Sequence, residues 1–285
     1  MSEITSETCS HDCSSCKAAC ASRQAQSQPQ FEPLYDDAKV RHVIGVVSGK
    51  GGVGKSLVTS LLACAMQRRG YRTAVLDADL TGPSIPRAFG VTEKAEGGVA
   101  CLYPSVSAGG TQIMSMNLLL DNDTDPVIWR GPIIANMVRQ MWSQVLWKDV
   151  DYLFVDMPPG TGDVPLTVFQ SLPVDGAILV TSPQSLVGMI VEKAIRMVGE
   201  MNIPVLGMVE NFSYYQCPDC GSRHSIFGPS HLEETAEAFH IPVTASLPID
   251  PAVAAACDAG RIETVHNGWL DALADAIEAR FETKA

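Results

Sequence analysis

Residues 49–56 read Gly-Lys-Gly-Gly-Val-Gly-Lys-Ser, and this glycine-rich segment restricts the possible fold more than any other part of the chain. The fixed positions of the phosphate-binding loop pattern are filled by Gly49, Gly54, Lys55 and Ser56. The apolar run at 42–47 predicts a strand before the loop, and apolar residues at helical spacing from Leu57 onward predict a helix after it. Because strand, glycine loop and helix follow in the required order, the pattern indicates a nucleotide site rather than an isolated glycine-rich turn.

The loop residues suit phosphate chemistry. Glycines let backbone N–H groups turn towards phosphate oxygens without a Cβ in the way, and the N-terminus of the next helix adds partial positive charge. We expect Lys55 to reach the β- and γ-phosphates and the Ser56 hydroxyl to ligate Mg²⁺. The predicted nucleotide-binding residues of the loop are Gly49, Lys50, Gly51, Gly52, Val53, Gly54, Lys55 and Ser56.

Apolar runs alternate with helical patterns from about residue 40 onward. The predicted strands are 43–47, 73–77, 152–156, 176–181, 204–209 and 243–247. The predicted helices are 55–69, 132–147, 184–201, 230–240 and 268–282. This alternation predicts an α/β fold with a mainly parallel sheet flanked by helices. The stretch 97–126, which contains two glycine pairs, is expected to form a hairpin or loop outside it, and its role is not readable from the sequence.

The chain divides into three regions. Residues 1–22 are cysteine-rich, 23–39 form a polar linker, and 40–285 form the P-loop nucleotide-binding domain with a cysteine-containing insertion at 214–226. The formal net charge of −12 argues against nucleic acid or an anionic membrane as the main partner. The start of the chain is neither basic nor apolar, and no run approaches the roughly 20 apolar residues of a membrane span. We therefore expect a cytoplasmic protein, in which a count of nine cysteines points to metal binding rather than to disulfides.

Asp156 ends the predicted strand 152–156, at the carboxyl end of a buried strand, where open α/β sheets bind ligands. An aspartate in this place is usually a turn former. With a phosphate-binding loop upstream, it is instead predicted to be the carboxylate that acts with Mg²⁺. The glycines of the following segment 158–162 suit a loop that approaches a γ-phosphate and moves when that phosphate leaves.

Cys217 and Cys220 form a CxxC pair in a proline- and glycine-containing turn typical of metal sites. Two thiolates do not fill a tetrahedral site, and no second CxxC follows within the roughly 15–20 residues of a zinc ribbon. Three interpretations remain open: a second subunit supplies the same pair, His224 and another residue complete a zinc knuckle, or the pair is a redox-active dithiol. Three further cysteines are expected to be small core side chains: Cys64, Cys101 and Cys257.

Four more cysteines lie near the N-terminus: Cys9, Cys13, Cys16 and Cys20. One continuous helix would spread them over roughly 16 Å at 1.5 Å per residue, too far for one cluster. We expect either a compact loop around one 4Fe-4S cluster or zinc ion, or a helix whose thiols are shared between chains. The remaining interpretation is a disordered tail with oxidisable thiols.

Three further segments complete a resemblance to a known family: 77–86, 154–163, and 209–213 followed by the CxxC pair. Together with the GKGGVGKS loop, they resemble the Mrp/ApbC iron–sulfur cluster carrier ATPases of the ParA/MinD superfamily. The resemblance covers about residues 40–280. It implies a MinD-like P-loop NTPase fold, ATP as the nucleotide, and a homodimer bridged by a 4Fe-4S cluster on Cys217 and Cys220 of both subunits.

The resemblance also implies roles for single residues. Lys50 matches the lysine that crosses the dimer interface to the partner's nucleotide, and Asp79 matches the residue that positions the attacking water. The alternative for Asp79 is a helix or turn cap, and Asp77 is expected to be structural. Asn211 matches the position that hydrogen-bonds the adenine, for which an amide offers both a donor and an acceptor.

These features predict a dimeric ATPase that carries a 4Fe-4S cluster and transfers it to apo-proteins. One alternative is a positioning ATPase like MinD or ParA, but membrane-cycling members need a basic amphipathic C-terminal helix. The helix predicted at 268–282 is mostly acidic beside its apolar stripe and is expected to pack on the sheet. The other alternative is an ATP-gated reductase that resembles the nitrogenase iron protein, which places its cluster cysteines on separate segments.

Overall fold

The computed structural model describes residues 31–79, 84–98, 100–119, 131–184 and 187–282. Within these ranges, nine strands form one sheet: β1 (Val40–Ser48), β2 (Thr73–Asp77), β5 (Ser105–Val106), β6 (Gln112–Ser115), β7 (Val150–Asp156), β8 (Gly176–Thr181), β9 (Val205–Gln216), β10 (Arg223–His224) and β11 (Thr244–Pro248). Two more strands form a separate pair: β3 (Glu96–Gly97) and β4 (Leu102–Tyr103).

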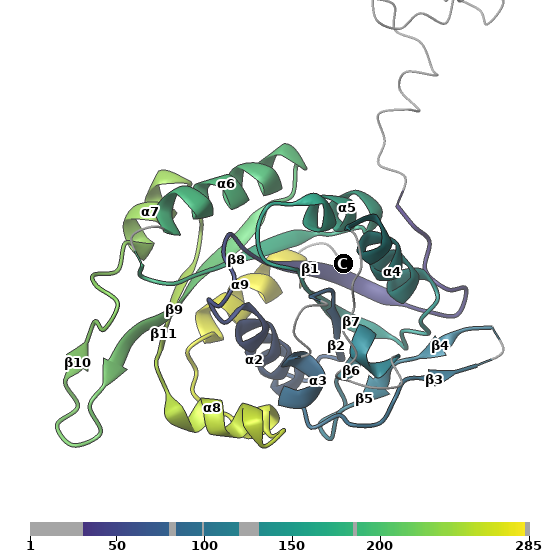
Figure 1. Ribbon diagram of the computed structural model, residues 1–285, viewed down its shortest axis with the longest axis horizontal. Coiled ribbons are helices and arrows are strands. Elements are labelled where there is room, and N and C mark those ends of the chain that lie inside the picture. The colour runs from purple at the N-terminus through teal and green to yellow at the C-terminus, as the bar shows by residue number, and fades with distance from the viewer. Residues whose placement is uncertain (1–30, 80–83, 99, 120–130, 185–186, 283–285) are drawn as a thin grey trace, which may run out of the picture.

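Helices cover both faces of the sheet (Figure 1). The α-helices of the described residues are α2 (Lys55–Arg68), α3 (Ser84–Ala88), α4 (Gly131–Ser143), α5 (Asp163–Ser171), α6 (Val187–Glu200), α7 (Leu232–Ala238), α8 (Pro251–Asp258) and α9 (Asp271–Glu282). The same ranges contain two short 3₁₀ helices, η2 (Met116–Leu118) and η3 (Ile262–Thr264). None of the helices described is both long enough and apolar enough to cross a bilayer.

The sheet has the order β10-β9-β8-β1-β7-β2-β6-β5, and β11 pairs with β9. The inner pairings are all parallel, whereas β5 and β10 pair antiparallel at the two edges. The carboxyl ends of the parallel strands therefore meet at one edge of the sheet, where open α/β sheets bind ligands. The predicted α/β fold with a mainly parallel sheet is confirmed.

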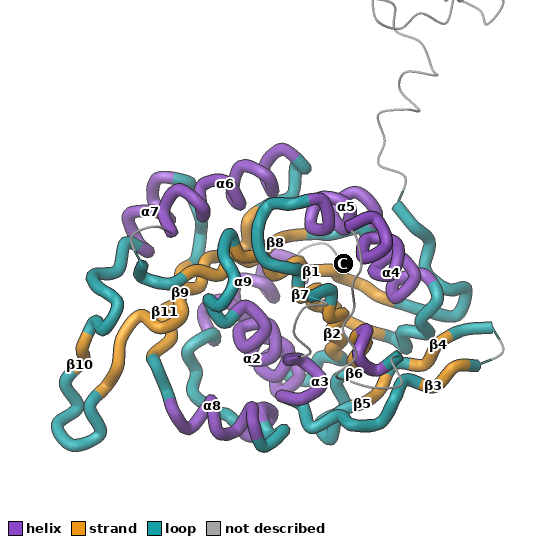
Figure 2. The backbone as a smooth tube through the Cα atoms, in the orientation of Figure 1, coloured by secondary structure: helices purple, strands orange, loops and turns teal. Residues whose placement is uncertain are grey.

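Strand β1 explains why the core has two halves. Side chains alternate between the faces of a strand, so Val43 and Val47 face the helices α4 to α7, while Ile44 and Val46 face α2, α3, α8 and α9. All four are at most 2% exposed. The sheet is thus buried between two helical layers (Figure 2).

The prediction for the stretch 97–126 was correct only in part. The predicted hairpin exists as the β3–β4 pair, but the stretch also supplies β5 and β6, and β6 pairs in parallel with β2 inside the main sheet. Residues 120–126 lie outside the described residues. The prediction that this stretch lies outside the sheet was wrong for β6. A strand of four residues is too short to stand out by periodicity, and its burial is decided by the sheet around it.

Other boundaries also differ from the prediction. The predicted helix 132–147 ends at Ser143, because Leu102 pairs with the following segment through Val145. Three helices were missed: α3, α5 and α8. The start of α8 did carry a signal, since Asp250 caps it by accepting a hydrogen bond from the Ala252 N–H and Pro251 follows at the first helical position.

The C-terminal helix α9 packs on the sheet, as predicted. Leu273, Ile277 and Phe281 are at most 4% exposed and belong to the core on the α2 side. A Cβ built on Gly207 of β9 would lie 2.5 Å from a methyl carbon of Leu273, so the helix touches the strand itself. Its apolar stripe is therefore part of the protein core.

This packing predicts that Leu273→Ala lowers the free energy of unfolding by about 2–5 kcal/mol, because it removes a fully buried side chain and leaves a cavity. Asp275→Ala on the exposed face removes only a surface pair with Arg69 and should cost less than about 1 kcal/mol. Urea unfolding of both variants measures the difference. Equal effects would show that the stripe is not core.

Candidate functional site

The phosphate-binding loop joins β1 to α2 at the carboxyl edge of the sheet. Gly52 and Gly54 have φ values of 78° and 81°, in the left-handed region that favours glycine. Gly49 is required by a close approach: a Cβ there would lie 2.7 Å from the backbone carbonyl oxygen of Ile190 in α6. A Cβ on Gly54 would lie 2.1 Å from the side-chain nitrogen of Asn211 in β9. The loop is therefore enclosed by α6 on one side and β9 on the other.

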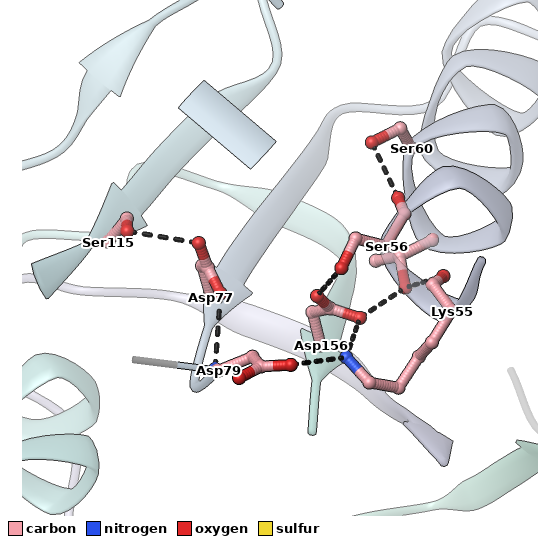
Figure 3. A network of polar contacts seen from close by, with 8 residues as sticks. Lys55, Ser56, Ser60, Asp77, Asp79, Ser115 and Asp156 are labelled. Carbon is pink, nitrogen blue, oxygen red and sulfur yellow. Dashed lines mark hydrogen bonds and ion pairs between the residues drawn. The ribbon is translucent and has the colours of Figure 1, made fainter. Parts of the chain in front are cut away.

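Lys55 is a buried cation among carboxylates, at 5% exposure (Figure 3). Its Nζ donates a hydrogen bond of 2.7 Å to Oδ1 of Asp156 and lies 3.5 Å from Oδ2 of Asp79. Asp156 is fully buried at the end of β7. A buried charge is costly unless it is paired, so this cluster holds Lys55 in place at the base of the loop.

Asp156 collects two further hydrogen bonds. The Ser56 hydroxyl donates to its Oδ2 at 2.5 Å, and the Thr59 hydroxyl donates to its Oδ1 at 2.9 Å. Ser56 and Asp156 thus place two hard oxygen ligands side by side, and such ligands are what Mg²⁺ prefers. The residues fit the ion. Thr59 was missed from the sequence, although it lies four residues after Lys55 and so on the same face of α2.

Asp77 lies next to this cluster but is not part of it. It pairs in register with Asp156 across β2 and β7, accepts a hydrogen bond of 3.0 Å from the Ser115 hydroxyl, and accepts one of 3.1 Å from the backbone N–H of Asp79. Burial, and next the Asp156 carboxylate, raise the pKa of Asp77 well above its usual range. These contacts fit a residue that fixes the turn carrying Asp79. Ser115 comes from β6, which the sequence did not reveal.

Lys50 makes a hydrogen bond to a residue outside this cluster. Its Nζ donates a hydrogen bond of 2.8 Å to the side-chain oxygen of Gln184, which is exposed at the loop after β8. Lys50 itself is exposed. The second lysine of the loop is thus accessible from outside the subunit, unlike Lys55.

Asn211 holds the loop to β9. Its side-chain nitrogen donates a hydrogen bond of 3.0 Å to the carbonyl oxygen of Val53, and its side-chain oxygen accepts one of 3.0 Å from the backbone N–H of Phe212. The side chain is only 1% exposed. The predicted contact with adenine stays a prediction, and the structure adds a structural contact that the sequence did not suggest.

Cys217 and Cys220 lie in the turn between β9 and β10, in a hairpin that extends beyond the helical layers (Figure 1). The Cys217 N–H donates to the Ser222 carbonyl at 2.9 Å, and Gly221 closes the turn with φ 72° and a hydrogen bond to the Cys217 carbonyl. Cys220 is exposed, with its sulfur 3.3 Å from the Ser222 hydroxyl, and this contact lowers the pKa of its thiol. The turn therefore presents the Cys220 thiol to solvent.

The hairpin does not complete a metal site by itself. Over the described ranges, no three His, Cys, Asp or Glu side chains gather closely enough to hold a metal ion. His224 lies in β10, paired with Tyr215, and is exposed. The zinc knuckle weighed from the sequence therefore has no third ligand among these residues.

The other cysteines differ in their burial. Cys64 is fully buried in α2, and burial raises the pKa of its thiol to about 12, which makes it inert. Cys101 and Cys257 are half-buried, so they are less enclosed than the sequence suggested. The N-terminal cysteines lie outside the described residues: Cys9, Cys13, Cys16 and Cys20.

The loop, the buried lysine and the carboxylate of β7 together define a P-loop NTPase. Consistent with this, a family model described as "ParA: NUBPL iron-transfer P-loop NTPase" matches residues 39–279. The chain belongs to this family.

Relatives and solved structures agree with this assignment. The chain is 44% identical over 232 residues to an iron-sulfur cluster carrier protein of Clostridium perfringens, covering 79% of this chain and 81% of the relative. It is 40% identical over 220 residues to the cytosolic Fe-S cluster assembly factor CFD1 of Kluyveromyces lactis, covering 74% of this chain and 78% of the relative. A nucleotide-binding protein of Archaeoglobus fulgidus, solved in complex with ADP, superposes with a TM-score of 0.74 at 40% identity, covering 81% and 91% of the two chains.

A more distant structure shows the fold alone. The cell division ATPase MinD of Pyrococcus furiosus superposes with a TM-score of 0.59 at 20% identity, covering 84% of this chain and 99% of that one. The predicted MinD-like P-loop NTPase fold is thereby confirmed.

The site predicts a pH-dependent effect of Asp77→Asn. Because the pKa of Asp77 is raised in the folded state, the fold retains a proton that the unfolded chain loses above about pH 4, so this group costs stability as the pH rises. Asparagine stays neutral, its side-chain oxygen can accept from the Asp79 N–H, and its NH2 group can donate to the Ser115 hydroxyl oxygen. We expect the variant to have a higher Tm than the parent at pH 8, with the gap narrowing towards pH 5. Melting curves without added nucleotide measure it, and a gap that widens towards pH 5 would contradict the prediction.

Proposed function

We propose that this protein is an ATPase that carries a 4Fe-4S cluster and transfers it to apo-proteins, acting as a homodimer in the cytoplasm. The observation that carries the proposal is that one strand, β9, reaches the phosphate-binding loop through Asn211 and continues directly into the cysteine turn. A nucleotide site and a pair of thiols, of which Cys220 is exposed and Cys217 half-buried, are thus parts of one structural unit. The names of the relatives, an iron-sulfur cluster carrier protein and a cytosolic Fe-S cluster assembly factor, support the same cargo and location.

Binding of ATP begins with an exchange of partners at Lys55. Its Nζ is 2.7 Å from Asp156, so phosphate oxygens compete with that carboxylate for the same cation. The backbone N–H groups of the glycine loop and the N-terminus of α2 contribute further positive potential. In the proposed complex Lys55 turns to the β- and γ-phosphates.

Ser56 and Asp156 would hold Mg²⁺, whose charge, when it is bound, neutralises charge that develops on the phosphates. Asp79, 3.5 Å from the Lys55 ammonium, is the carboxylate proposed to orient the attacking water. Asp77 keeps the turn in place through the backbone N–H of Asp79. Lys50 is proposed to reach the partner subunit's nucleotide, which its exposure permits.

The cluster is cargo, and its ligands are proposed to come from two subunits. Such a cluster normally takes four thiolates, whereas one cysteine turn supplies Cys217 and Cys220. The lowered pKa of Cys220 favours the thiolate that binds iron. Two turns that meet across a twofold axis would complete the set.

The alternative functions lack such support. The stripe of α9 is buried in the core and not available to a membrane, and both thiols of the turn lie in one hairpin, unlike the separate segments of the reductase weighed above. The cysteines at the N-terminus are proposed to hold a second metal site, for a cluster or zinc.

For the nucleotide site, we predict that Lys55→Ala weakens ATP binding by about 2–5 kcal/mol, because it removes the buried cation that faces the phosphates. Lys50→Ala should retain binding but lose turnover by about 10³–10⁵-fold, the range for cations supplied in trans. Asp79→Asn should bind ATP and stall hydrolysis. Calorimetry and phosphate release measure both steps, with Lys39→Ala as an exposed control. Full turnover of Lys50→Ala would exclude its role across the dimer.

For the cluster, we predict that protein lacking residues 1–22 holds about two irons per chain after anaerobic reconstitution and elutes as a dimer. Cys217→Ser or Cys220→Ser should remove the iron and the share of dimer stability that depends on it, because only the dimer completes the ligand set. Iron analysis and size-exclusion chromatography measure both. A monomer with stoichiometric zinc would refute the shared cluster.

A further inference from the structure

Strand β9 changes its conformation between the nucleotide site and the cysteine turn. Ser246 of β11 lies opposite Glu210, but Pro248 lies opposite Tyr214, so two steps along β11 match four along β9. The extra residues form a bulge, and bulges redirect the side chains they contain. The bulge is centred on Phe212.

Phe212 has φ 61°, which a non-glycine residue adopts only when its surroundings hold it there. Two neighbours do so. Its N–H donates to the side chain of Asn211, and the Ser213 hydroxyl lies 3.1 Å from the carbonyl oxygen of Glu210 and 2.5 Å from its carboxylate. These contacts hold the Phe212 backbone and thereby the direction of its side chain. Backbone strain of this kind concentrates at functional segments.

The Phe212 ring lies between the phosphate-binding loop and the cysteine hairpin. Its outermost carbon is 3.8 Å from the position a Cβ would take on Gly54 of the loop. On its other side, the ring centroid is 6.3 Å from that of Phe227, in an edge-to-face arrangement. Phe227 follows β10, so it belongs to the returning leg of the hairpin.

Besides the aromatic pair, the hairpin is held at its base by the Ile249 N–H, which donates a hydrogen bond of 2.7 Å to the Tyr214 carbonyl oxygen. Beyond the bulge, β9 and β10 pair through only two registers, Gln216 with Arg223 and Tyr215 with His224, and a two-stranded ribbon alone is marginally stable. The Arg223 guanidinium stacks 4.4 Å from the centre of the Tyr214 ring, which is a contact within the hairpin. The aromatic pair at the base of the hairpin is therefore well placed to set its orientation.

We propose that the Phe212 ring couples the nucleotide state of the phosphate-binding loop to the position of the cysteine hairpin, through Gly54 on one side and Phe227 on the other. Asn211 makes the coupling tight, because its buried amide must follow the Val53 carbonyl or lose its hydrogen bond. Linkage requires the converse as well: a ligand held by the thiols changes nucleotide affinity by the same factor. The proposal rests on the proposed function only in that the loop binds nucleotide.

Two adjacent exposed residues give a matched test. Phe227 is 41% exposed and pairs with the Phe212 ring, whereas its neighbour Ile226 is 58% exposed and carries no ring. Both lie outside the nucleotide site and the thiols, so Phe227→Ala and Ile226→Ala should fold and bind ADP with Mg²⁺ as the parent does. Circular dichroism and calorimetry check both conditions in the full-length, metal-free chain.

The measured quantity is the rate at which iodoacetamide alkylates Cys217 and Cys220 at fixed pH, with and without ADP and Mg²⁺, read by peptide mass spectrometry. In the parent and in Ile226→Ala, nucleotide should change this rate by about 5-fold or more, the lower range of allosteric coupling. In Phe227→Ala the change should fall below about 2-fold, because the ring contact is lost. Hydrogen exchange of the backbone amides in 214–227 should follow the same pattern.

Two results would overturn the proposal. If the parent binds ADP but its alkylation and exchange rates do not respond, the two sites are not coupled. If Phe227→Ala responds as strongly as the parent, the coupling does not pass through the ring. Failure of the parent to bind ADP at all would instead refute the proposed function, so the two failures are distinguishable.

Discussion

The fully buried carboxylate of Asp156 is the interaction on which the rest of the site depends. It accepts hydrogen bonds from Lys55, Ser56 and Thr59, all on the first two turns of α2, and so fixes this helix against the end of β7. Because a buried carboxylate without partners would be strongly unfavourable, loop, helix and strand must assemble together. Lys55, Ser56 and Asp156 itself supply what a nucleotide needs, a cation and two oxygen ligands, so the stability of the site and its chemistry have one origin.

Close packing then joins this site to distant parts of the chain. Glycine at position 49 admits the backbone of α6, and glycine at position 54 admits the side chain of Asn211. Neither contact leaves room for a side chain on the loop. Because the packing is this close, a movement of the loop must displace α6 and β9 as well. Since β9 runs on into the cysteine turn, the proposed cluster site is attached to the nucleotide site by a continuous strand. The bulge at Phe212 is where this connection can change direction.

Much of the fold could be predicted because it rests on local patterns. The six long apolar runs became strands, and the strand, loop and helix around residues 49–56 were recognised from their order. Strand β6 has four residues, and helices α3 and α5 have five and nine. They could not be recognised, because such a short strand and such short helices show too little periodicity and are decided by what buries them. For the site, Lys55, Ser56 and Asp156 followed from the motif, whereas Ser115 was invisible because β6 itself was.

The sequence by itself determined which chemical groups are present: a phosphate-binding loop with two lysines, carboxylates at strand ends, and a CxxC pair. Residue type and spacing suffice for this, because each motif is local and its chemistry follows from its side chains. Only the tertiary structure decided how these groups are connected. Lys55 is buried and paired while Lys50 is exposed, and Asn211 bonds the loop from a strand more than 150 positions away. Such contacts depend on strand order and register, which the parallel sheet sets over long separations and which no local pattern encodes.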